Sequence, residues 1–240
     1  MHKTIEHTMK QGSLEWHIAR LGKVTASHAK DVVTSGGKPT ANKARETYRN
    51  ELLAERMLGR AADHFTTDAM KRGTELEPAA RTWYKLETGN RVRQVGFVTR
   101  DDIAGCGCSP DGICDSRLLE IKVPVAHNLI GLILGEAPQE DYNLQIQFQM
   151  WICGVALCDL VLFSDTDGIP SRIYTVAKDD KMHAAFDTHI PAFIAELDAC
   201  EARIVAMGGV KISPAEAYKP VDAGIPDGFG PPPAGSILTR

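Results

Sequence analysis

A cluster of short apolar segments between residues 92 and 123 most constrains the fold of this chain. Glycine and turn residues divide the cluster into pieces that have the length of strands and are too short for helices. Longer segments with helical spacing come before the cluster, and a helix, two strands and a further helix follow it. This order predicts an α/β (α+β) fold in which helices flank a mixed central sheet. The expected helices cover 6–19, 25–33, 41–58, 67–89, 143–155 and 184–207, and the expected strands cover 92–98, 105–108, 112–114, 118–123, 160–164 and 173–177.

The chain length of 240 residues suits one large domain with an additional tail. We expect one domain over 1–211, with a helical part over about 1–90 and a core over about 91–211. The proline- and glycine-rich stretch 212–240 has the composition of a linker or an extended arm. No apolar run has the length of about 18 residues that a membrane helix needs, and the N-terminus lacks the apolar stretch of a signal peptide. We therefore expect a cytoplasmic protein with no membrane partner.

Charge is distributed unevenly along the chain. Residues 1–100 hold 18 Lys and Arg against 11 Asp and Glu, whereas residues 101–240 hold 9 against 20. The two parts therefore carry net charges of +7 and −11, which together give the −4 of the whole chain. A basic first part favours a phosphate-binding surface, although ordinary solvated helix faces would give the same count.

Six cysteines lie at positions 106, 108, 114, 153, 158 and 200. The first three could form part of a zinc site, but no C-x-x-C pair completes the pattern. We therefore expect buried free thiols in place of a zinc site or an iron–sulfur cluster. A metal-binding or redox protein built around the cysteines is a weak alternative for the same reason.

The clearest chemical pattern is an Asp-x8-Glu-x-Lys arrangement within a strand–turn–strand segment. We expect residues 115–117 to form the turn, which sets Gly112 opposite Glu120. Asp111 then lies beside Glu120, and Lys122, two residues farther along the strand, projects from the same face as Glu120. Two carboxylates and an ammonium group therefore meet at one edge of the sheet.

This group of side chains has a chemical use. Carboxylate oxygens suit Mg²⁺, which keeps several waters and also binds phosphate oxygens. Held by Asp111, Glu120 and the backbone carbonyl of Ile121, the ion would polarise a phosphodiester and lower the pKa of a bound water. Lys122 would orient that water and offset charge that develops on the phosphate. An exposed Glu–Lys strand with an Asp-Gly turn has the same letters, but the complete spacing within a hairpin favours the catalytic interpretation.

These residues resemble the PD-(D/E)-x-K motif of restriction-endonuclease-like nucleases, with Pro110-Asp111 and Glu120-Ile121-Lys122 as its two parts. More closely, the chain resembles the lambda-exonuclease-type family, the YqaJ-type viral recombinases. The order and spacing of the matching blocks, which continue to about residue 207, carry this resemblance. The blocks are Trp16, 20–22, 25–27, Gly73, Glu77, 108–112, 119–122, Pro124, 145–147, 150–151, 186–187, 190–191 and 193–194.

The resemblance implies roles for residues outside the hairpin. Glu77 would bind a second metal ion from the preceding helix, and Gln147 would line the metal site. Arg20, Ser27 and Ser109 would hold the 5′-phosphate of a DNA end. An arginine can grip two phosphate oxygens, and the first turn of a helix attracts anions, so the second implication has a physical basis. A helix-surface carboxylate at Glu77 and a simple cap at Ser27 are the alternative interpretations.

The resemblance also implies an activity. It implies a Mg²⁺-dependent 5′-to-3′ exonuclease that digests one strand of double-stranded DNA to mononucleotides and leaves a 3′ single strand for recombination by strand annealing. Two Mg²⁺ ions, replaceable by Mn²⁺, would serve the reaction. The implied assembly is a ring-shaped homotrimer around DNA, with a single-strand annealing recombinase as partner. The gene would belong to a phage or prophage and act in a bacterial host cell.

Two departures from the family leave the handling of DNA ends open. Residues 123–128 contain no arginine, and the loop over 35–41 differs. One alternative is therefore a PD-(D/E)-x-K DNA nuclease of other polarity or of endonucleolytic action. Another is a DNA-binding module that kept the fold without metal chemistry, against which the intact acidic residues and lysine argue.

Overall fold

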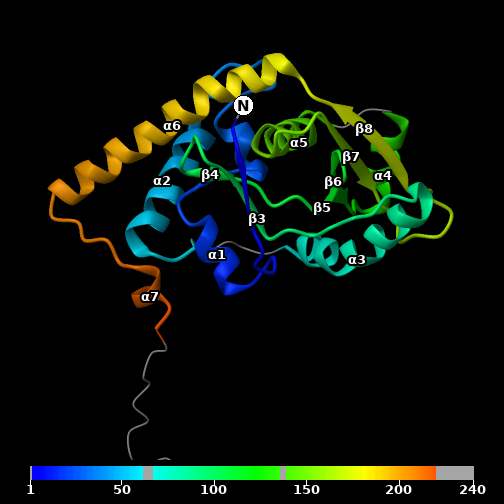
Figure 1. Ribbon diagram of the computed structural model, residues 1–240, viewed down its shortest axis with the longest axis horizontal. Helices are drawn as coiled ribbons and strands as arrows, with labels where there is room; N and C mark the ends of the chain where they lie inside the picture. The colour runs from blue at the N-terminus through cyan, green and yellow to red at the C-terminus, as the bar shows by residue number, and fades with distance from the viewer. Residues whose placement is uncertain (1, 62–66, 136–138, 220–240) are drawn as a thin grey trace, which may run out of the picture.

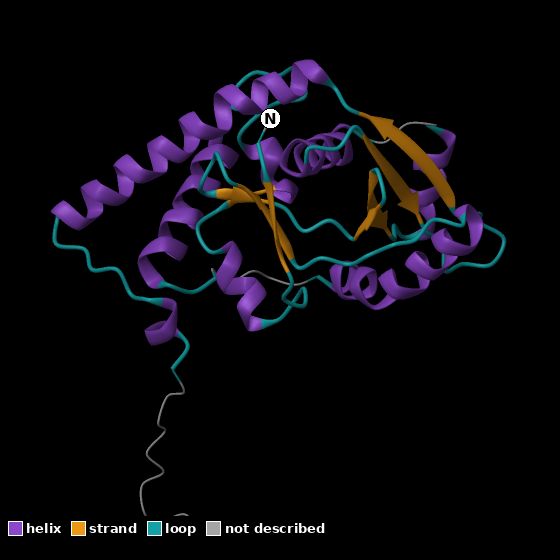
Figure 2. Ribbon diagram, in the orientation of Figure 1, coloured by secondary structure: helices purple, strands orange, loops and turns teal. Residues whose placement is uncertain are grey.

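The computed structural model describes residues 2–61, 67–135 and 139–219. Helices cover both faces of a mixed sheet, and a second group of helices and short strands lies beside it (Figure 1). Figure 2 shows the same arrangement by type of secondary structure. The α/β (α+β) class expected from the order of segments is therefore confirmed. In chain order the elements are β1 (Thr4–His7), α1 (Leu14–Arg20), β2 (Val24–Thr25), the 3₁₀ helix η1 (Ala26–Asp31), α2 (Lys43–Leu58), α3 (Asp68–Thr88), β3 (Phe97–Arg100), β4 (Cys106–Gly107), β5 (Gly112–Cys114), β6 (Arg117–Lys122), α4 (Ala126–Leu134), α5 (Glu140–Cys153), β7 (Leu157–Leu162), β8 (Arg172–Ala177), α6 (Asp180–Ala206) and α7 (Pro214–Ala217).

The main sheet contains four strands in the order β5-β6-β7-β8. β5 and β6 form an antiparallel hairpin, β6 and β7 are parallel, and β8 is antiparallel to β7. The parallel step requires a crossover connection, which α4 and α5 supply. Side chains alternate along β6, so Leu118 packs with α4 and α5, whereas Leu119 and Ile121 pack with α3. The helices thus cover opposite faces of the sheet.

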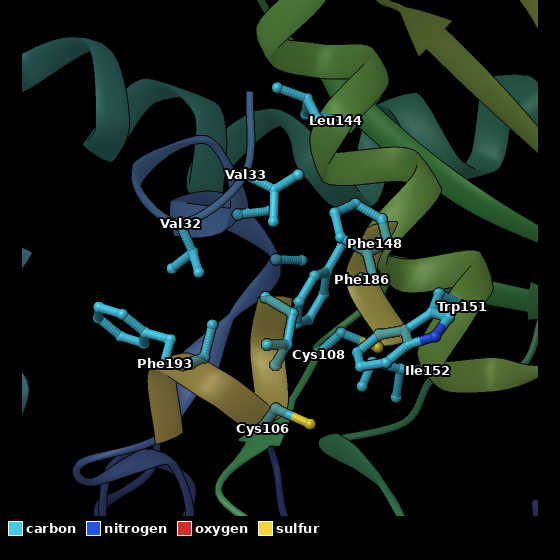
Figure 3. Close-up of a cluster of buried hydrophobic side chains, with 14 of the residues drawn as sticks. Val32, Val33, Cys106, Cys108, Leu144, Phe148, Trp151, Ile152, Phe186 and Phe193 are labelled. Carbon is cyan, nitrogen blue, oxygen red and sulfur yellow. The ribbon is translucent and has the colours of Figure 1, made fainter. Parts of the chain in front are cut away.

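A large apolar core connects η1 and β4 with α5 and α6 (Figure 3). The rings of Phe148, Trp151 and Phe186 lie 5.3–5.6 Å apart between centroids, which are favourable separations for aromatic pairs. Cys108, the residue that follows β4, is fully buried in the same core. Gly107 before it allows a close approach, because a Cβ there would lie 2.3 Å from Cζ of Phe97. Cys108, the first residue of the segment 108–111, therefore packs against α5 in this core.

Two small sheets bring the N-terminal segments to the main sheet. β1 pairs with β3 antiparallel, and β2 pairs with β4 parallel. Isolated bridges join Val98 to Cys108 and Arg93 to Ile113, which ties β3 to the hairpin segment. Because β2 follows α1 directly and β4 precedes residues 108–111, this pairing brings the end of α1 close to that segment.

Most predicted elements are confirmed with boundaries shifted by a few residues. The expected strand over 92–98 forms later, as β3, and the expected helix over 6–19 is wrong in its first part, because β1 is a strand there. That strand forms through pairing with distant β3, and local sequence does not report such pairing. The segment 25–33 contains a 3₁₀ helix, and Thr25 makes no side-chain cap hydrogen bond to it. Helix α4 was not expected from the sequence.

The start of the expected tail has structure of its own. Ser213 caps α7 through a capping box with Glu216. The backbone N–H of Ile212 donates to the carbonyl of Met57 at 2.8 Å, and residues 220–240 lie outside the described residues. Among the helices of the described part, none is long and apolar enough to cross a membrane.

Four of the six cysteines are buried, and all six are free thiols. Sγ of Cys108 lies 3.6 Å from Sγ of half-buried Cys153 on α5.

Candidate functional site

The β5–β6 hairpin carries the acidic pair, with a register one residue different from the expected one. Gly112 pairs with Leu119, not with Glu120. The turn therefore contains only Asp115 and Ser116, and two residues are the commonest length of a hairpin turn. Continuing the register one step places Asp111 opposite Glu120, so the expected neighbourhood of the two carboxylates is confirmed.

Asp111 is held by the strand that carries Glu120. Its Oδ2 accepts a hydrogen bond of 2.6 Å from the backbone N–H of Ile121. Burial raises the pKa of Asp111 well above its ordinary value, and the carboxylates of Glu120 and Glu77 raise it further. Buried carboxylates that repel one another favour a cation between them. The role of the Ile121 carbonyl as a ligand stays a prediction.

Glu120 is the most constrained side chain of the site, with 2% of its surface exposed. Its Oε1 lies 2.7 Å from Nζ of Lys122 and accepts a hydrogen bond of 2.6 Å from Nε2 of Gln145. Its Oε2 accepts one of 2.8 Å from Nε2 of Gln149. These donors fix the carboxylate in one orientation, which is what a metal ligand or an electrostatic catalyst needs.

Lys122 projects from the same face of β6 as Glu120, as the strand alternation predicted. Its ammonium group also donates to Oε1 of Gln145 at 3.0 Å and lies 5.3 Å from the ring centre of Tyr142. Burial alone would lower the pKa of Lys122, but the Glu120 and Asp111 carboxylates outweigh it and raise that pKa above the ordinary value. Lys122 therefore acts as a cation and hydrogen-bond donor at neutral pH.

Glu77 lies on α3 beside the pair and forms an ion pair with Arg81 one helical turn away. Arg81 also donates from Nε to the backbone carbonyl of Asp111 at 3.1 Å. Burial raises the pKa of Glu77, Arg81 partly offsets this, and Glu120 raises the pKa further. Arg81 thus connects α3 to the segment that carries Asp111, a link that the sequence did not reveal.

The donor set fits Mg²⁺ in chemistry and falls short of a complete cage. Within the part of the chain that the structure describes, no group of three or more His, Cys, Asp or Glu side chains is arranged to hold a metal ion. Asp111 and Glu120 form a pair, and Mg²⁺ is commonly held by one or two carboxylates, with waters and substrate phosphates completing its shell. Glu77 would have to turn from Arg81 to reach an ion.

Gln147 does not line the site, and its predicted placement is wrong. Its Nε2 donates to the carbonyl of Ala177 at 2.8 Å, and its Oε1 accepts from the N–H of Asp179 at 2.9 Å. It therefore connects α5 to the start of α6. Helix geometry gives the reason: residues two apart point in different directions, whereas Gln145 and Gln149, four apart, share the face toward Glu120.

The second group of predicted residues lies at the end of α1. Arg20 donates from Nη1 to Oγ of Ser109 at 3.3 Å, and its guanidinium lies 4.2 Å from the ring centre of Trp16. Trp16 donates to the same Oγ at 2.9 Å. Burial lowers the pKa of Arg20, and nearby Tyr48 offsets part of that effect. Arg20 and Ser109 are therefore in contact, as predicted, and Ser109 lies two residues before Asp111 in the chain.

Ser27 faces the same cavity as Arg20. The cavity has a volume of about 420 Å³ and is also lined by Lys23, Thr25 and His28. Ser27 is exposed in the first turn of η1, with its Oγ 3.5 Å from Oγ1 of Thr25. Two of the three predicted phosphate-binding residues thus line one concavity, which we name the end pocket, lined by Arg20, Lys23 and Ser27. Glu51 and Glu55 also line it, and Ser109 is joined to it through its contact with Arg20.

Three residues of the site, Gln145, Gln149 and Arg81, were not predicted from the sequence. Gln145 and Gln149 could have been found from their spacing of four on an otherwise apolar helix, which places two amides on one face. Arg81 could have been suspected from its spacing of four from Glu77. The contact of Arg81 with the Asp111 carbonyl depends on tertiary packing and has no local signal.

Comparisons with known proteins place this geometry in a family. Residues 15–156 match the YqaJ-like viral recombinase domain. No curated protein sequence matches the chain significantly. An alkaline exonuclease from Laribacter hongkongensis (LHK-Exo) is 38% identical in a structural superposition with a TM-score of 0.75, which covers 82% of this chain and 98% of that one. A second structure of that enzyme, a complex with dAMP, superposes equally well, with the same 38% identity, TM-score of 0.75 and coverage.

A phage-related exonuclease from Haemophilus somnus has the same fold. Its TM-score is 0.60 at 15% identity, and the superposition covers 76% of this chain and 96% of that one. At this identity the likeness concerns the fold alone.

Proposed function

We propose that this chain, which belongs to the YqaJ-like viral recombinase family, is a Mg²⁺-dependent DNA exonuclease that digests one strand of a duplex from its 5′ end. Membership of the family and likeness to an alkaline exonuclease support a DNA exonuclease. The finer statements, 5′-to-3′ polarity, release of mononucleotides and a 3′ strand left for annealing in a bacterial host, rest on the arrangement of the two sites and on the sequence resemblance.

One observation carries the proposal. Asp111, one member of the Asp111–Glu120–Lys122 group, follows Ser109 by two residues in the chain, and Ser109 contacts Arg20, which lines the end pocket. A terminal phosphate held in the end pocket would place the adjacent part of its strand toward the acidic pair. An enzyme built in this way would cut at a fixed distance from a strand end, which is the property of an exonuclease.

The reaction assigns each side chain a task. Mg²⁺, when bound by Asp111 and Glu120, would polarise the scissile phosphate and lower the pKa of a bound water. Lys122 would hold that water and offset the negative charge that develops on the phosphate. Gln145 keeps the Lys122 ammonium oriented through its Oε1. Glu77 would serve a second ion after it leaves Arg81, and Mn²⁺ would substitute for Mg²⁺.

The direct test uses linear and closed circular duplex DNA with Mg²⁺ or with EDTA. We expect digestion of the linear form only, and only with Mg²⁺. A label on the 5′ end of one strand should be released early as a mononucleotide, whereas a label on the 3′ end should remain in long products. Cleavage of the circle would favour the endonucleolytic alternative, and early release of the 3′ label would reverse the polarity.

The end pocket predicts a dependence on the terminal phosphate. Charge-assisted hydrogen bonds are worth about 1.5–3 kcal/mol each, so Arg20→Ala should slow digestion of 5′-phosphorylated ends roughly ten- to a hundredfold. On 5′-hydroxyl ends the unmodified protein should already be slow, and the variant should lose little more. Initial rates on the two substrates measure this interaction between mutation and substrate.

Two further variants separate the pocket from general effects. Arg20→Lys keeps the charge without the two-pronged geometry and should give an intermediate rate on phosphorylated ends. Arg203→Ala removes an exposed arginine at the last turn of α6 and should leave both rates unchanged. Equal rates of the unmodified protein on both ends, with equal losses in Arg20→Ala, would remove the pocket from the mechanism.

The proposed assembly is a homotrimeric ring that encloses DNA and passes the exposed 3′ strand to a single-strand annealing recombinase. The support for this assembly is the family resemblance. Light scattering of the purified chain should therefore give a mass about three times the 26.1 kDa of one chain. An active species with the mass of a single chain would exclude the ring.

A further inference from the structure

Helix α5 presents a polar row to the nuclease site although most of the helix is buried. Tyr142, Gln145 and Gln149 follow one another at spacings of three and four, so they lie on one face of the helix. Tyr142 and Gln145 contact Lys122, and both glutamines contact Glu120. Gln149 is the deepest of the three, with 1% of its surface exposed.

The two ends of the Gln149 amide differ in how they are satisfied. Nε2 donates to Oε2 of Glu120 at 2.8 Å. Oε1 is fully buried, and no donor among the described residues lies within hydrogen-bonding distance of it. A buried carbonyl oxygen without a donor is unfavourable, so such an atom in a polar site indicates a donor that arrives with a ligand or a water. Gln147 on the same helix shows the contrast, because both ends of its amide are bonded.

The hydrogen bonds of Glu120 also leave an open position beside Gln149. Each oxygen of a carboxylate has about two positions for accepting a hydrogen bond or binding a metal ion. Oε1 already has two partners, Lys122 and Gln145, whereas Oε2 has one, Gln149. Oε2 therefore has the remaining capacity, and the unsatisfied amide oxygen belongs to the side chain that contacts Oε2.

We propose that Gln149 is a positioning residue of the nuclease site. Its Nε2 fixes Glu120 so that Oε2 is the oxygen offered to a divalent cation, and its Oε1 accepts a hydrogen bond from a water bound to that cation. The inference rests on the proposed metal-dependent function. It adds a residue that orients a metal ligand and a metal-bound water together.

The test measures Mn²⁺ binding to the full-length chain without DNA, by calorimetry or by the electron paramagnetic resonance signal of free Mn²⁺. Gln149→Met keeps the length of the side chain and removes both hydrogen-bonding groups. Loss of such an outer partner typically weakens metal binding about 10- to 100-fold, which is the expected change in Kd. Gln149→Asn retains both groups on a shorter stem and should recover part of the affinity.

A matched control separates positioning from stability. Gln147→Met removes an equally buried amide from the same helix, so it should lower the melting temperature and leave the Kd for Mn²⁺ unchanged. A folded Gln149→Met with the Kd of the unmodified protein would overturn the proposal. Should that variant not fold, Gln149→Asn decides alone, because unchanged affinity there overturns the proposal and weakened affinity supports it.

The outcomes also distinguish this inference from the function on which it rests. Failure of the unmodified protein to bind Mn²⁺ would overturn the metal-dependent function and the role of Gln149 together. Binding that is lost in Asp111→Asn and unaffected by the Gln149 variants would support the function and overturn the role of Gln149 alone.

Discussion

Replacing Asp111 by asparagine should abolish cleavage while the protein stays folded and still binds duplex DNA. The amide can still accept the hydrogen bond from Ile121, so the hairpin geometry is kept, but the charge that would hold Mg²⁺ is lost. Turnover should fall more than about a hundredfold, since even the loss of an outer-shell partner of a metal ligand lowers metal affinity or activity about 10- to 100-fold. Initial rates with saturating Mg²⁺ and linear duplex measure the effect.

The same substitution should raise the melting temperature in the absence of metal. Burial, Glu120 and Glu77 all raise the pKa of Asp111, which means that its ionised form is unfavourable in the folded protein. An uncharged amide removes that repulsion, which is the usual exchange of stability for function at an active site. Asp115→Asn in the turn of the same hairpin is the control and should change neither quantity. Normal turnover in Asp111→Asn would show that the metal site lies elsewhere.

Replacing Lys122 by methionine should lower kcat by about a hundred- to a thousandfold, the effect seen when one electrostatic stabiliser of a transition state is removed. The methionine side chain keeps most of the length and the apolar stem of the lysine, but it loses the ammonium group that lies over the Tyr142 ring. KM for duplex DNA should change little, because the phosphate contacts that position the substrate belong mainly to the end pocket. Steady-state kinetics at saturating Mg²⁺ separate the two parameters.

Two comparisons make this second test specific. Lys178→Met, at the surface beyond β8, removes an ammonium group paired with Asp180 and should leave kcat unchanged. A rise in KM with an unchanged kcat in Lys122→Met would assign Lys122 to substrate binding and not to the chemical step.

The acidic pair and its lysine could be predicted from sequence because their geometry is local. Strand alternation places Glu120 and Lys122 on one face, and a hairpin brings Asp111 back to the same point with any turn of two or three residues. The error of one residue in register therefore did little harm: Asp111 still reached the backbone of Ile121. The proximity of Arg20 and Ser109 was predicted from the resemblance, because no local sequence pattern indicates it.

The features that failed depend on packing between distant segments. The face of α5 that turns inward is decided by β6 and α6, so the choice among Gln145, Gln147 and Gln149 could not be made from a helix that is buried on nearly all sides. β1 is a strand because β3 lies beside it, more than eighty residues later in the chain. Where an element depends on a remote partner, its own residues predict it poorly.

The order in which the site is completed has a consequence for the synthesis of the protein. A ribosome delivers the N-terminus first, so α1 and η1, which carry residues of the end pocket, emerge long before α5, against which η1 packs in the finished core. Until α5 has emerged and packed, Glu120 lacks its two glutamine donors, and Lys122 lacks its contacts with Gln145 and Tyr142. An unfinished or prematurely terminated chain that ends before α5 therefore lacks both the helix that packs against η1 and the donors that orient the acidic pair. For a protein proposed to digest DNA, we therefore expect incomplete copies that end before α5 to lack nuclease activity.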